Sequence, residues 1–254
     1  MITTILAAGA TPPENNFGLM NSLNEGGPVT WTVAIILTIF LFFTLYILFT
    51  KLFEQQKVIN QGKRVGAQFW AANSLREGAA KLEKNSAYKQ IVDDGLQAQD
   101  QHGRLTDPVE AHDWVHGSLA RSEAAINSQL GGGLAFLATV GSTAPFIGLF
   151  GTVLGIYRAL IKIGQAGQAS IDKVAGPVGE ALIMTAFGLV VAVPAVLAFN
   201  FLQRRNKAIA ENLSAFSNDV LGYIASDGAV KPTVARKAPA APVKPATTTT
   251  ATKA

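Results

Sequence analysis

Cysteine is absent from this chain of 254 residues, so disulfide bonds, thiol catalysis and thiolate metal sites are excluded. Charge is also scarce, because lysine, arginine, aspartate and glutamate make up only 15% of the sequence. The formal net charge of +4 is too small to predict nucleic-acid binding by itself. With a mean hydropathy of +0.27, this shortage of charge favours a membrane protein over a soluble enzyme.

Three long apolar stretches are the most prominent positive feature. They lie at residues 28–50, 134–157 and 177–203. Each is long enough to cross a bilayer as a helix, which takes about 20 apolar residues. The third reads ALIMTAFGLVVAVPAVLAFNFLQ without a charge, preceded by Glu180 and followed by Arg204 and Arg205. The sequence therefore predicts an all-α membrane protein with three transmembrane helices.

The three stretches differ in composition. The first is rich in Phe, Ile and Leu on every side, which suits contact with lipid. The other two are rich in small residues, including Gly148, Gly151 and Gly155, which let helix backbones approach closely in a membrane. We expect a homo-oligomer with the first helix outside and the other two inside. Ordinary packing within one chain is the alternative, but three helices make a thin bundle.

Basic residues predict the orientation of the spans. The first 27 residues contain no Lys or Arg, whereas basic residues are frequent from Lys51 onward and after the third span. The positive-inside rule then places the N-terminus outside and the C-terminus in the cytoplasm. The expected segments between and around the spans are an external N-terminal segment at 1–27, a cytoplasmic helical region at 51–133, an external connection at 158–176, a cytoplasmic helix at 204–226 and a disordered tail at 227–254.

The cytoplasmic part is expected to be helical. An acid followed by proline at residues 107–108 is a good helix start, and no breaker follows until the glycines at 131–133. We therefore predict one long helix from Pro108 into the second span, with a bend at the glycines. Apolar residues at helical spacing from Leu202 to Ile224 predict that the third span also continues as a helix. Shorter helices are expected between Lys51 and Arg104.

Few polar groups lie near the two small-residue spans. Glu180 is read either as a proton or cation site at the mouth of a pore, or as an acid that complements the helix dipole. Thr152 and Thr185 lie inside the spans and have two interpretations. Either their hydroxyls line a path for protons, or each hydroxyl bonds to a backbone carbonyl of the preceding turn. If protons cross here, a partner helix must supply a titratable group, because the centre of these spans holds neither acid nor histidine.

The remaining candidates have structural interpretations. Pro145 and Pro194 each remove a backbone donor inside a span. Asn200 is expected to form hydrogen bonds between helices. His112 and His116 have the spacing of a zinc-binding pair, but no third ligand is evident, so we expect a solvated helix face and no metal or other cofactor. No nucleophilic triad, phosphate loop or dinucleotide-binding motif is present, and we do not expect an enzyme.

Two motifs resemble one known family. The run TAPFIGLFGTVLGI (Thr143–Ile156) and the run GEALIMTAFGLVVAVPAVLAFN (Gly179–Asn200) are similar to those of the ExbB/TolQ/MotA proton-channel family, and most similar to its ExbB branch. The motifs and their surroundings cover about residues 108–224. Three spans count against the MotA branch, whose members have four, whereas the TolQ branch has the same plan.

The resemblance implies a function that the residues alone do not. ExbB-like proteins form a ring, usually a pentamer, in the bacterial inner membrane around helices of ExbD, which carry an aspartate. Proton flow then drives TonB, which energises outer-membrane transport of iron siderophores and vitamin B12. The resemblance gives pore roles to Thr152, Glu180 and Thr185, and structural roles to Thr143, Pro145 and Asn200. The alternatives are a TolQ-like subunit of envelope maintenance and a membrane scaffold that does not conduct.

Overall fold

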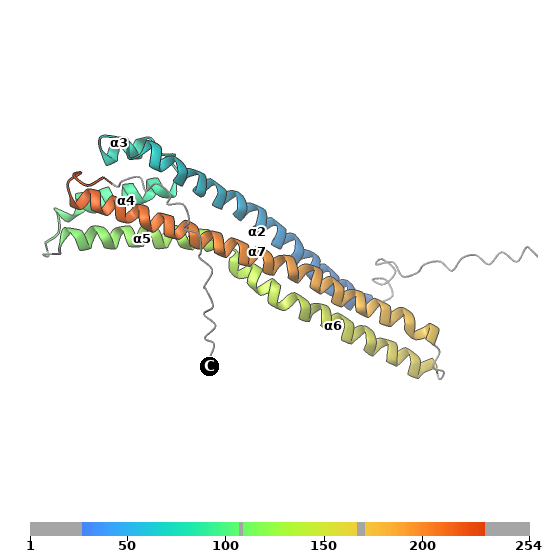
Figure 1. The fold of residues 1–254 in the computed structure, drawn as a ribbon. Coiled ribbons are helices and arrows are strands. Elements are labelled where there is room, and N and C mark those ends of the chain that lie inside the picture. Colours follow the sequence, from blue (N-terminus) through green and yellow to red (C-terminus); the bar gives the residue numbers. More distant parts are fainter. Residues whose placement is uncertain (1–26, 107–108, 167–170, 232–254) are drawn as a thin grey trace, which may run out of the picture. The chain divides into compact units, whose positions relative to one another are not determined.

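The computed structural model describes residues 27–106, 109–166 and 171–231, and all regular structure in these ranges is helical. The helices are α2 (Gly27–Gln68), α3 (Leu75–Ala80), α4 (Ala87–His102), α5 (Ala111–Gly131), α6 (Leu134–Ala166) and α7 (Ile171–Ala225) (Figure 1). Three stretches of helix are long and apolar enough to cross a membrane, at Gly27–Gly66, Ala111–Gln165 and Ala181–Ala225. The predicted all-helical chain with three candidate spans is confirmed. The segment at 1–26 and the tail from residue 232 lie outside the described residues.

Helix α2 is longer than the span it contains. It does not end near Thr50 but continues to Gln68. The residues after the span include Glu, Gln and Lys, which favour helix, and neither proline nor glycine interrupts them until Gly62. The shorter helices expected between 51 and 104 therefore begin only after residue 68, as α3 and α4.

The predicted bend at the glycines is a full break. Helix α5 ends at Gly131 and α6 begins at Leu134. Gly133 has a φ of +84°, a left-handed conformation that favours glycine. At the other end, α5 begins at Ala111 rather than at Pro108, which lies outside the described residues. Helix α7, in contrast, runs unbroken from Ile171 to Ala225, as expected for a third span that continues as helix.

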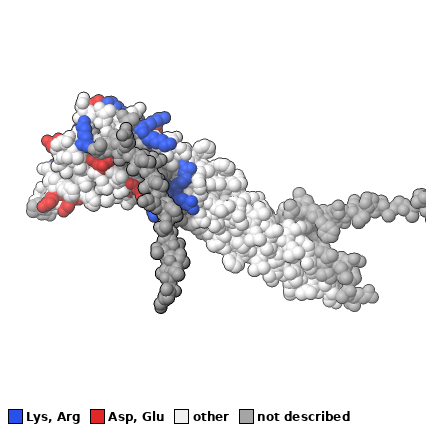
Figure 2. All heavy atoms as spheres, in the orientation of Figure 1, with Lys and Arg blue, Asp and Glu red and all other residues white. Residues whose placement is uncertain are grey.

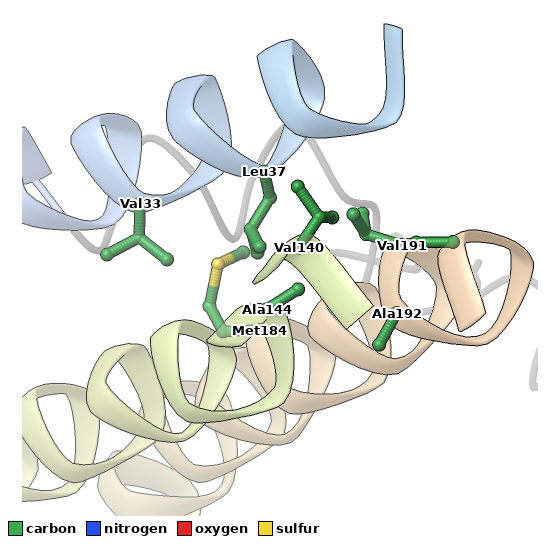
Figure 3. Close-up of a cluster of buried hydrophobic side chains, with 8 residues drawn as sticks. Val33, Leu37, Val140, Ala144, Met184, Val191 and Ala192 are labelled. Carbon is green, nitrogen blue, oxygen red and sulfur yellow. The ribbon is translucent and has the colours of Figure 1, made fainter. Parts of the chain in front are cut away.

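The chain divides into two compact units, and the first contains the three apolar stretches at 28–50, 134–157 and 177–203. This first unit comprises the chain up to Val58 and Ala125–Glu211. Its core joins α2, α6 and α7, which lie side by side in Figure 1. The buried side chains of one cluster, drawn in Figure 3, are Val33, Leu37, Val140, Ala144, Met184, Val191, Ala192 and Ala195. Because lipid is as apolar as these side chains, close packing rather than the hydrophobic effect holds such helices together.

The exposed surface of the spans is apolar. Figure 2 shows white spheres over the spans of α6 and α7, with lysine and arginine visible where the apolar stretches have ended. Large side chains such as Phe42 on α2, Phe146 on α6 and Leu182 on α7 are 64–69% exposed. A surface of this kind suits lipid or another apolar helix.

The second unit, Ile59–Ala124 and the chain from Asn212 onward, has an aromatic core. The ring of Phe216 lies 5.3 Å from that of Phe69 and 5.1 Å from that of Tyr88, both edge-on. Charged pairs such as Arg76 with Asp100, 2.9 Å apart, lie on its exposed surface and contribute little to stability. Edge-on aromatic contacts of this kind add to the burial of apolar surface in a packed core.

Candidate functional site

Two spans, α6 and α7, approach each other closely where they cross, at a pair of glycines. A Cβ atom added to Gly148 would lie 2.7 Å from the carbonyl oxygen of Met184 and 3.2 Å from the Cα of Thr185. A Cβ atom added to Gly188 would lie 2.7 Å from the carbonyl oxygen of Ala144. No ordinary side chain fits at such distances, so the two backbones touch through paired glycines. The packing role of Gly148 stays a prediction, and these short distances are the geometry that favours it.

The two candidate threonines belong to this crossing. Thr185 precedes Gly188 by three residues and is half-buried, with its Cα beside Gly148. Thr152 follows Gly148 by four residues, one helical turn, and is only 6% exposed. The crossing therefore brings both hydroxyls to one pair of helices, although they are 33 positions apart in the sequence.

The hydroxyls of these threonines differ in their bonding. The Thr152 hydroxyl donates to the carbonyl oxygen of Leu149 at 2.6 Å, which is the preceding-turn bond considered above. Among the described residues, no hydrogen bond of the Thr185 hydroxyl is found. In the described part of the chain, Thr185 is therefore the threonine of the pair with a hydroxyl still available to a partner.

Helix α2 closes one side of the crossing. A Cβ atom on Gly151 would lie 3.1 Å from the Cβ of Met184 and 3.4 Å from a methyl carbon of Val33. Gly155, one turn further along α6, is also buried. Gly151 and Gly155 therefore lie on the same tightly packed side of α6 as Gly148.

The structure describes the backbone of Glu180 but not its side chain. The residue lies within α7, one residue before the buried Ala181. It is not at the first turn, because α7 begins nine residues earlier, at Ile171. The dipole interpretation loses its basis, since that effect falls off within the first turn of a helix.

The other predicted residues do not interrupt the helices that carry them. Thr143 is half-exposed and donates to the carbonyl oxygen of Thr139 at 2.8 Å. Pro145 and Pro194 are half-buried, and neither ends its helix. Asn200 is exposed, and within the described residues it makes no hydrogen bond, so its role between helices stays a prediction.

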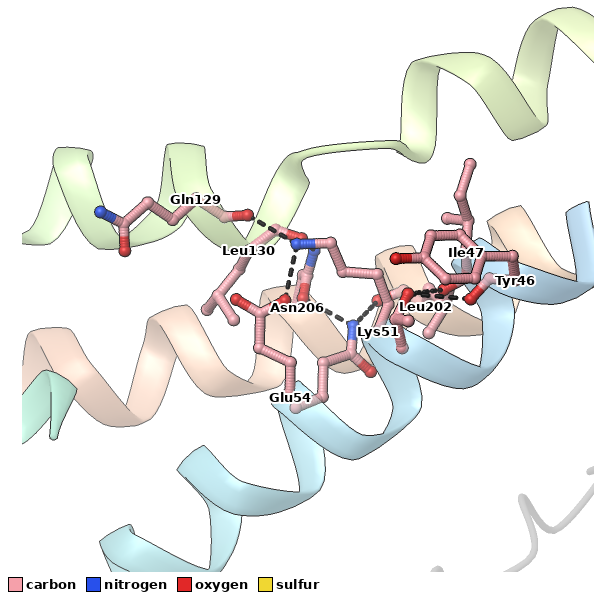
Figure 4. Close-up of polar contacts among 10 residues, drawn as sticks. Tyr46, Ile47, Lys51, Glu54, Gln129, Leu130, Leu202 and Asn206 are labelled. Atoms are coloured by element: carbon pink, nitrogen blue, oxygen red, sulfur yellow. Dashed lines mark hydrogen bonds and ion pairs between the residues drawn. The ribbon is translucent and has the colours of Figure 1, made fainter. Parts of the chain in front are cut away.

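A polar cluster at the ends of the spans was not predicted from the sequence. The Lys51 ammonium donates to the carbonyl oxygen of Gln129 at 2.8 Å and to Glu54 Oε2 at 2.7 Å (Figure 4). Asn206 Nδ2 donates to the carbonyl oxygen of Leu130 at 3.0 Å. Side chains from α2 and α7 thus bond to the last carbonyls of α5, and the carbonyl of Gln129 also accepts from the backbone N–H of Gly132 at 3.1 Å.

Gln55 joins α2 to α7 within this cluster. Its side chain is fully buried and donates to the carbonyl oxygen of Leu202 at 3.0 Å and to Asn206 Oδ1 at 2.7 Å. The spacing in the sequence could have placed Gln55 on the buried face of α2. It follows the buried Leu37 by 18 positions, which is five whole helical turns. A glutamine on the buried side of a helix needs a partner on a neighbouring helix.

The histidine pair forms no larger cluster in the described chain. The rings of His112 and His116 are stacked, with centroids 6.4 Å apart, and both residues are exposed. No group of three or more metal-binding side chains gathers in the parts of the chain with known placement.

Comparison with known proteins agrees on one family. Residues 83–215 match the model of the MotA/TolQ/ExbB proton channel family. The biopolymer transport protein ExbB of Xanthomonas campestris pv. campestris (strain B100) is 38% identical over 213 residues, 80% of this chain and 84% of that protein. The ExbB of Neisseria gonorrhoeae is 43% identical over 153 residues, 58% and 70% of the two chains. The Tol-Pal system protein TolQ of Haemophilus influenzae is 49% identical over 84 residues, 33% and 37% of the two chains.

Proposed function

This chain belongs to the MotA/TolQ/ExbB proton channel family, and on that premise we propose that it is the ring-forming subunit of an ExbB-type proton-driven motor in the bacterial inner membrane. It works with an ExbD-like protein that supplies the membrane aspartate. Through a TonB-like protein the motor energises uptake of iron siderophores and vitamin B12 across the outer membrane.

The observation that supports this proposal is the α6–α7 crossing. It places Thr152 and Thr185 on the same pair of spans. In the described part of these two spans, no acid or histidine lies near the middle. Such a surface can pass a proton along hydroxyls or water but cannot hold one, so the titrating group belongs to a partner. Glu180 directly precedes the uncharged stretch Ala181–Gln203 in the sequence, and we propose that its carboxyl group serves the mouth of this path.

The exposed apolar surface supports an oligomer. Phe146 and Phe150 on α6 are 69% and 55% exposed, and Leu189 and Val193 on α7 are 48% and 55% exposed. We propose that copies of the chain cover these faces in a ring of five subunits. In this ring α6 and α7 lie inside and α2 lies against lipid. In this arrangement the N-terminus and the connection at 158–176 are periplasmic, and residues 51–133 and 204–254 are cytoplasmic.

The TolQ branch is the second candidate, favoured by the match to the TolQ protein of Haemophilus influenzae. A deletion strain distinguishes the two branches. With a ferric siderophore as the sole iron source, loss of growth that the gene restores supports the ExbB branch. Sensitivity to mild detergent with normal iron uptake supports the TolQ branch.

A non-conducting scaffold predicts a different result from both branches. Vesicles that contain the chain with its ExbD-like partner would then hold a pH gradient as well as empty vesicles do. Proton flux that depends on Thr185 and Glu180 would exclude the scaffold.

A further inference from the structure

Met184, the residue before Thr185 on α7, packs closely against α6. It is 1% exposed. Its Cβ and Cγ atoms lie 3.1 and 3.2 Å from the position that a Cβ atom on Gly151 would take. Its carbonyl oxygen lies 2.7 Å from the corresponding position on Gly148. Met184 therefore rests on the backbone of α6 at two glycines, about one helical turn apart.

The far end of the Met184 side chain contacts α2. Figure 3 shows it pointing toward Val33 and Leu37, and all three side chains belong to one buried cluster. Val33 and Leu37 are 3% and 0% exposed. A methyl carbon of Val33 also lies 3.4 Å from the position of a Cβ atom on Gly151. The side chain of Met184 therefore extends from α7 into a space closed by both α2 and α6.

The glycines of α6 bring α7 close but do not hold it along the helix axis. Gly148, Gly151 and Gly155 are buried on one side of α6, and without side chains they form a smooth surface. A slide of α7 by one residue moves it by about 1.5 Å. Hydrogen bonds between hydroxyl oxygens span only about 2.5–3.0 Å, so such a slide breaks them. A side chain enclosed by two other helices opposes this slide.

We propose that Met184 is a positioning residue, whose enclosed side chain fixes α7 along α6 and so aligns Thr185 with Thr152. Thr185 directly follows Met184, and Thr152 directly follows Gly151, so the contact between Met184 and Gly151 sets the level of both hydroxyls. This inference rests on the function proposed above, in which the two hydroxyls serve a proton path. Helix α2 then acts on that path through packing alone.

Proton flux tests the proposal in vesicles that contain the chain with its ExbD-like partner. Met184→Ala leaves a cavity beside Gly151 and is expected to lower the flux per complex about tenfold or more, because a misplacement of about 1 Å can cost 10²-fold. Met184→Leu keeps the volume of the side chain and is expected to restore the flux to within about twofold. Native flux in Met184→Ala, or equal losses in the two variants, would overturn the proposal.

Leu202→Ala is the matched control for the cavity. Leu202 is 0% exposed and follows Met184 by 18 positions on α7, which is five whole turns, so it faces the same side in a different buried cluster. Its truncation is expected to lower the thermal stability of the complex as much as Met184→Ala does, while the flux stays within about twofold of native. An equal loss of flux in both alanine variants would overturn the positioning role, because lost stability alone would then explain it.

Cross-linking separates this inference from the proposed function. The chain has no cysteine, so Leu149→Cys with Thr185→Cys introduces the only two thiols. Leu149 is exposed and adjoins Gly148, and the Cα of Thr185 lies 3.2 Å from the position of a Cβ atom on Gly148, so a short bifunctional thiol reagent can join the pair. Links between copies run as dimers on a denaturing gel and are counted separately.

The yield of the link within one chain is expected to fall when Met184→Ala is added and to stay unchanged with Met184→Leu or Leu202→Ala. An unchanged yield in Met184→Ala would overturn the positioning role, whatever the flux. If the yield falls as expected but the native complex conducts no protons, the packing role of Met184 stands and the proposed function is overturned.

Discussion

At the scale of single residues, the difference between Thr152 and Thr185 is the most informative. The hydroxyl of Thr152 is bound to the carbonyl of Leu149, 2.6 Å away, whereas that of Thr185 has no such bond among the described residues. Because Thr185 lies beside the glycine contact at Gly148, its hydroxyl is held on a rigid part of the helix pair. A functional hydroxyl needs both properties, availability and a fixed position.

Thr185→Val is the first residue-scale prediction. Valine has the shape of threonine without the hydroxyl, so the helix crossing and assembly are expected to survive while energised uptake is lost. Uptake of a ferric siderophore by a strain carrying the variant measures the effect, and co-purification with the partner checks assembly. Normal uptake would remove Thr185 from the proton path.

Glu180 gives the second prediction. If its carboxyl group takes part in proton movement, Glu180→Ala reduces uptake more than Glu180→Gln, because glutamine keeps a polar group that can bond to water. The same uptake measurement, made on both variants at equal protein level, tests this. Wild-type activity in both would leave Glu180 without a role in conduction.

Gly188 gives the third prediction, which concerns stability. Gly188→Ala places a Cβ atom 2.7 Å from the carbonyl oxygen of Ala144, and backbone cannot move aside as a side chain can. We expect a loss of about 2 kcal/mol, the usual cost of an overpacked contact. Thermal unfolding in detergent measures it.

Gly222→Ala is the control on the same helix, because nothing lies within 4 Å of an added Cβ atom there. It is expected to stabilise α7 by roughly 0.5–1 kcal/mol through helix propensity. Equal effects of the two substitutions would show that the crossing is looser than these distances require.

At the scale of helices, the break between α5 and α6 depends on its neighbours. Gly133 adopts a φ of +84°, and a Cβ atom there would lie 3.1 Å from Ile47 of α2. Lys51 and Asn206 bond to the carbonyls of Gln129 and Leu130 where α5 ends. The break is therefore fixed by glycine conformation and by donors from two other helices.

Asn206→Leu is the prediction at this scale. It removes the donor to Leu130 and the acceptor of Gln55, so an unfolding free energy lower by about 1–3 kcal/mol is expected. Thermal unfolding is again the measurement. The double variant Gln55→Leu with Asn206→Leu should lose less than the sum of the two single losses, because it leaves no buried amide unpaired.

Asn200→Leu is the matched control, since Asn200 is exposed and makes no hydrogen bond in the described part of the chain. Little change is expected in the single chain. A drop in the stability of the assembled complex alone would instead support the predicted role of Asn200 between helices.

At the scale of the whole molecule, the distribution of titratable groups decides what the chain can do alone. The sequence has no acid, base or histidine from Ala181 to Gln203, and none from Ala124 to Tyr157. A relay across a bilayer needs a titratable group near its middle. On the function proposed above, the titratable group in the middle of the path therefore has to come from a partner.

The prediction at this scale concerns vesicles. Vesicles containing only this chain are expected to hold an imposed pH gradient, whereas vesicles that also contain the ExbD-like partner dissipate it. A pH-sensitive dye inside the vesicles gives the rate. Dissipation of the gradient by the chain alone would contradict the need for a partner. Vesicles that contain the complete complex with Thr185→Val are expected to hold the gradient.

The positions of the spans and the family could be predicted from the sequence. Hydropathy is local, so a run such as Ala181–Gln203 identifies its own helix whatever its neighbours are. The paired motifs at Thr143–Ile156 and Gly179–Asn200 predicted the family that the comparisons then showed. Helix ends were less predictable, because α2 continues to Gln68 through residues with no strong stop signal.

The sequence by itself determined that this is a three-span helical membrane protein with few polar groups in its spans, because composition and hydropathy act within each segment. Only the tertiary structure decided that Gly148 meets Gly188, that Thr152 and Thr185 share one crossing, and that Gln55, Asn206 and Lys51 stabilise the break between α5 and α6. Those contacts join residues far apart in the sequence, and they depend on how whole helix surfaces fit together.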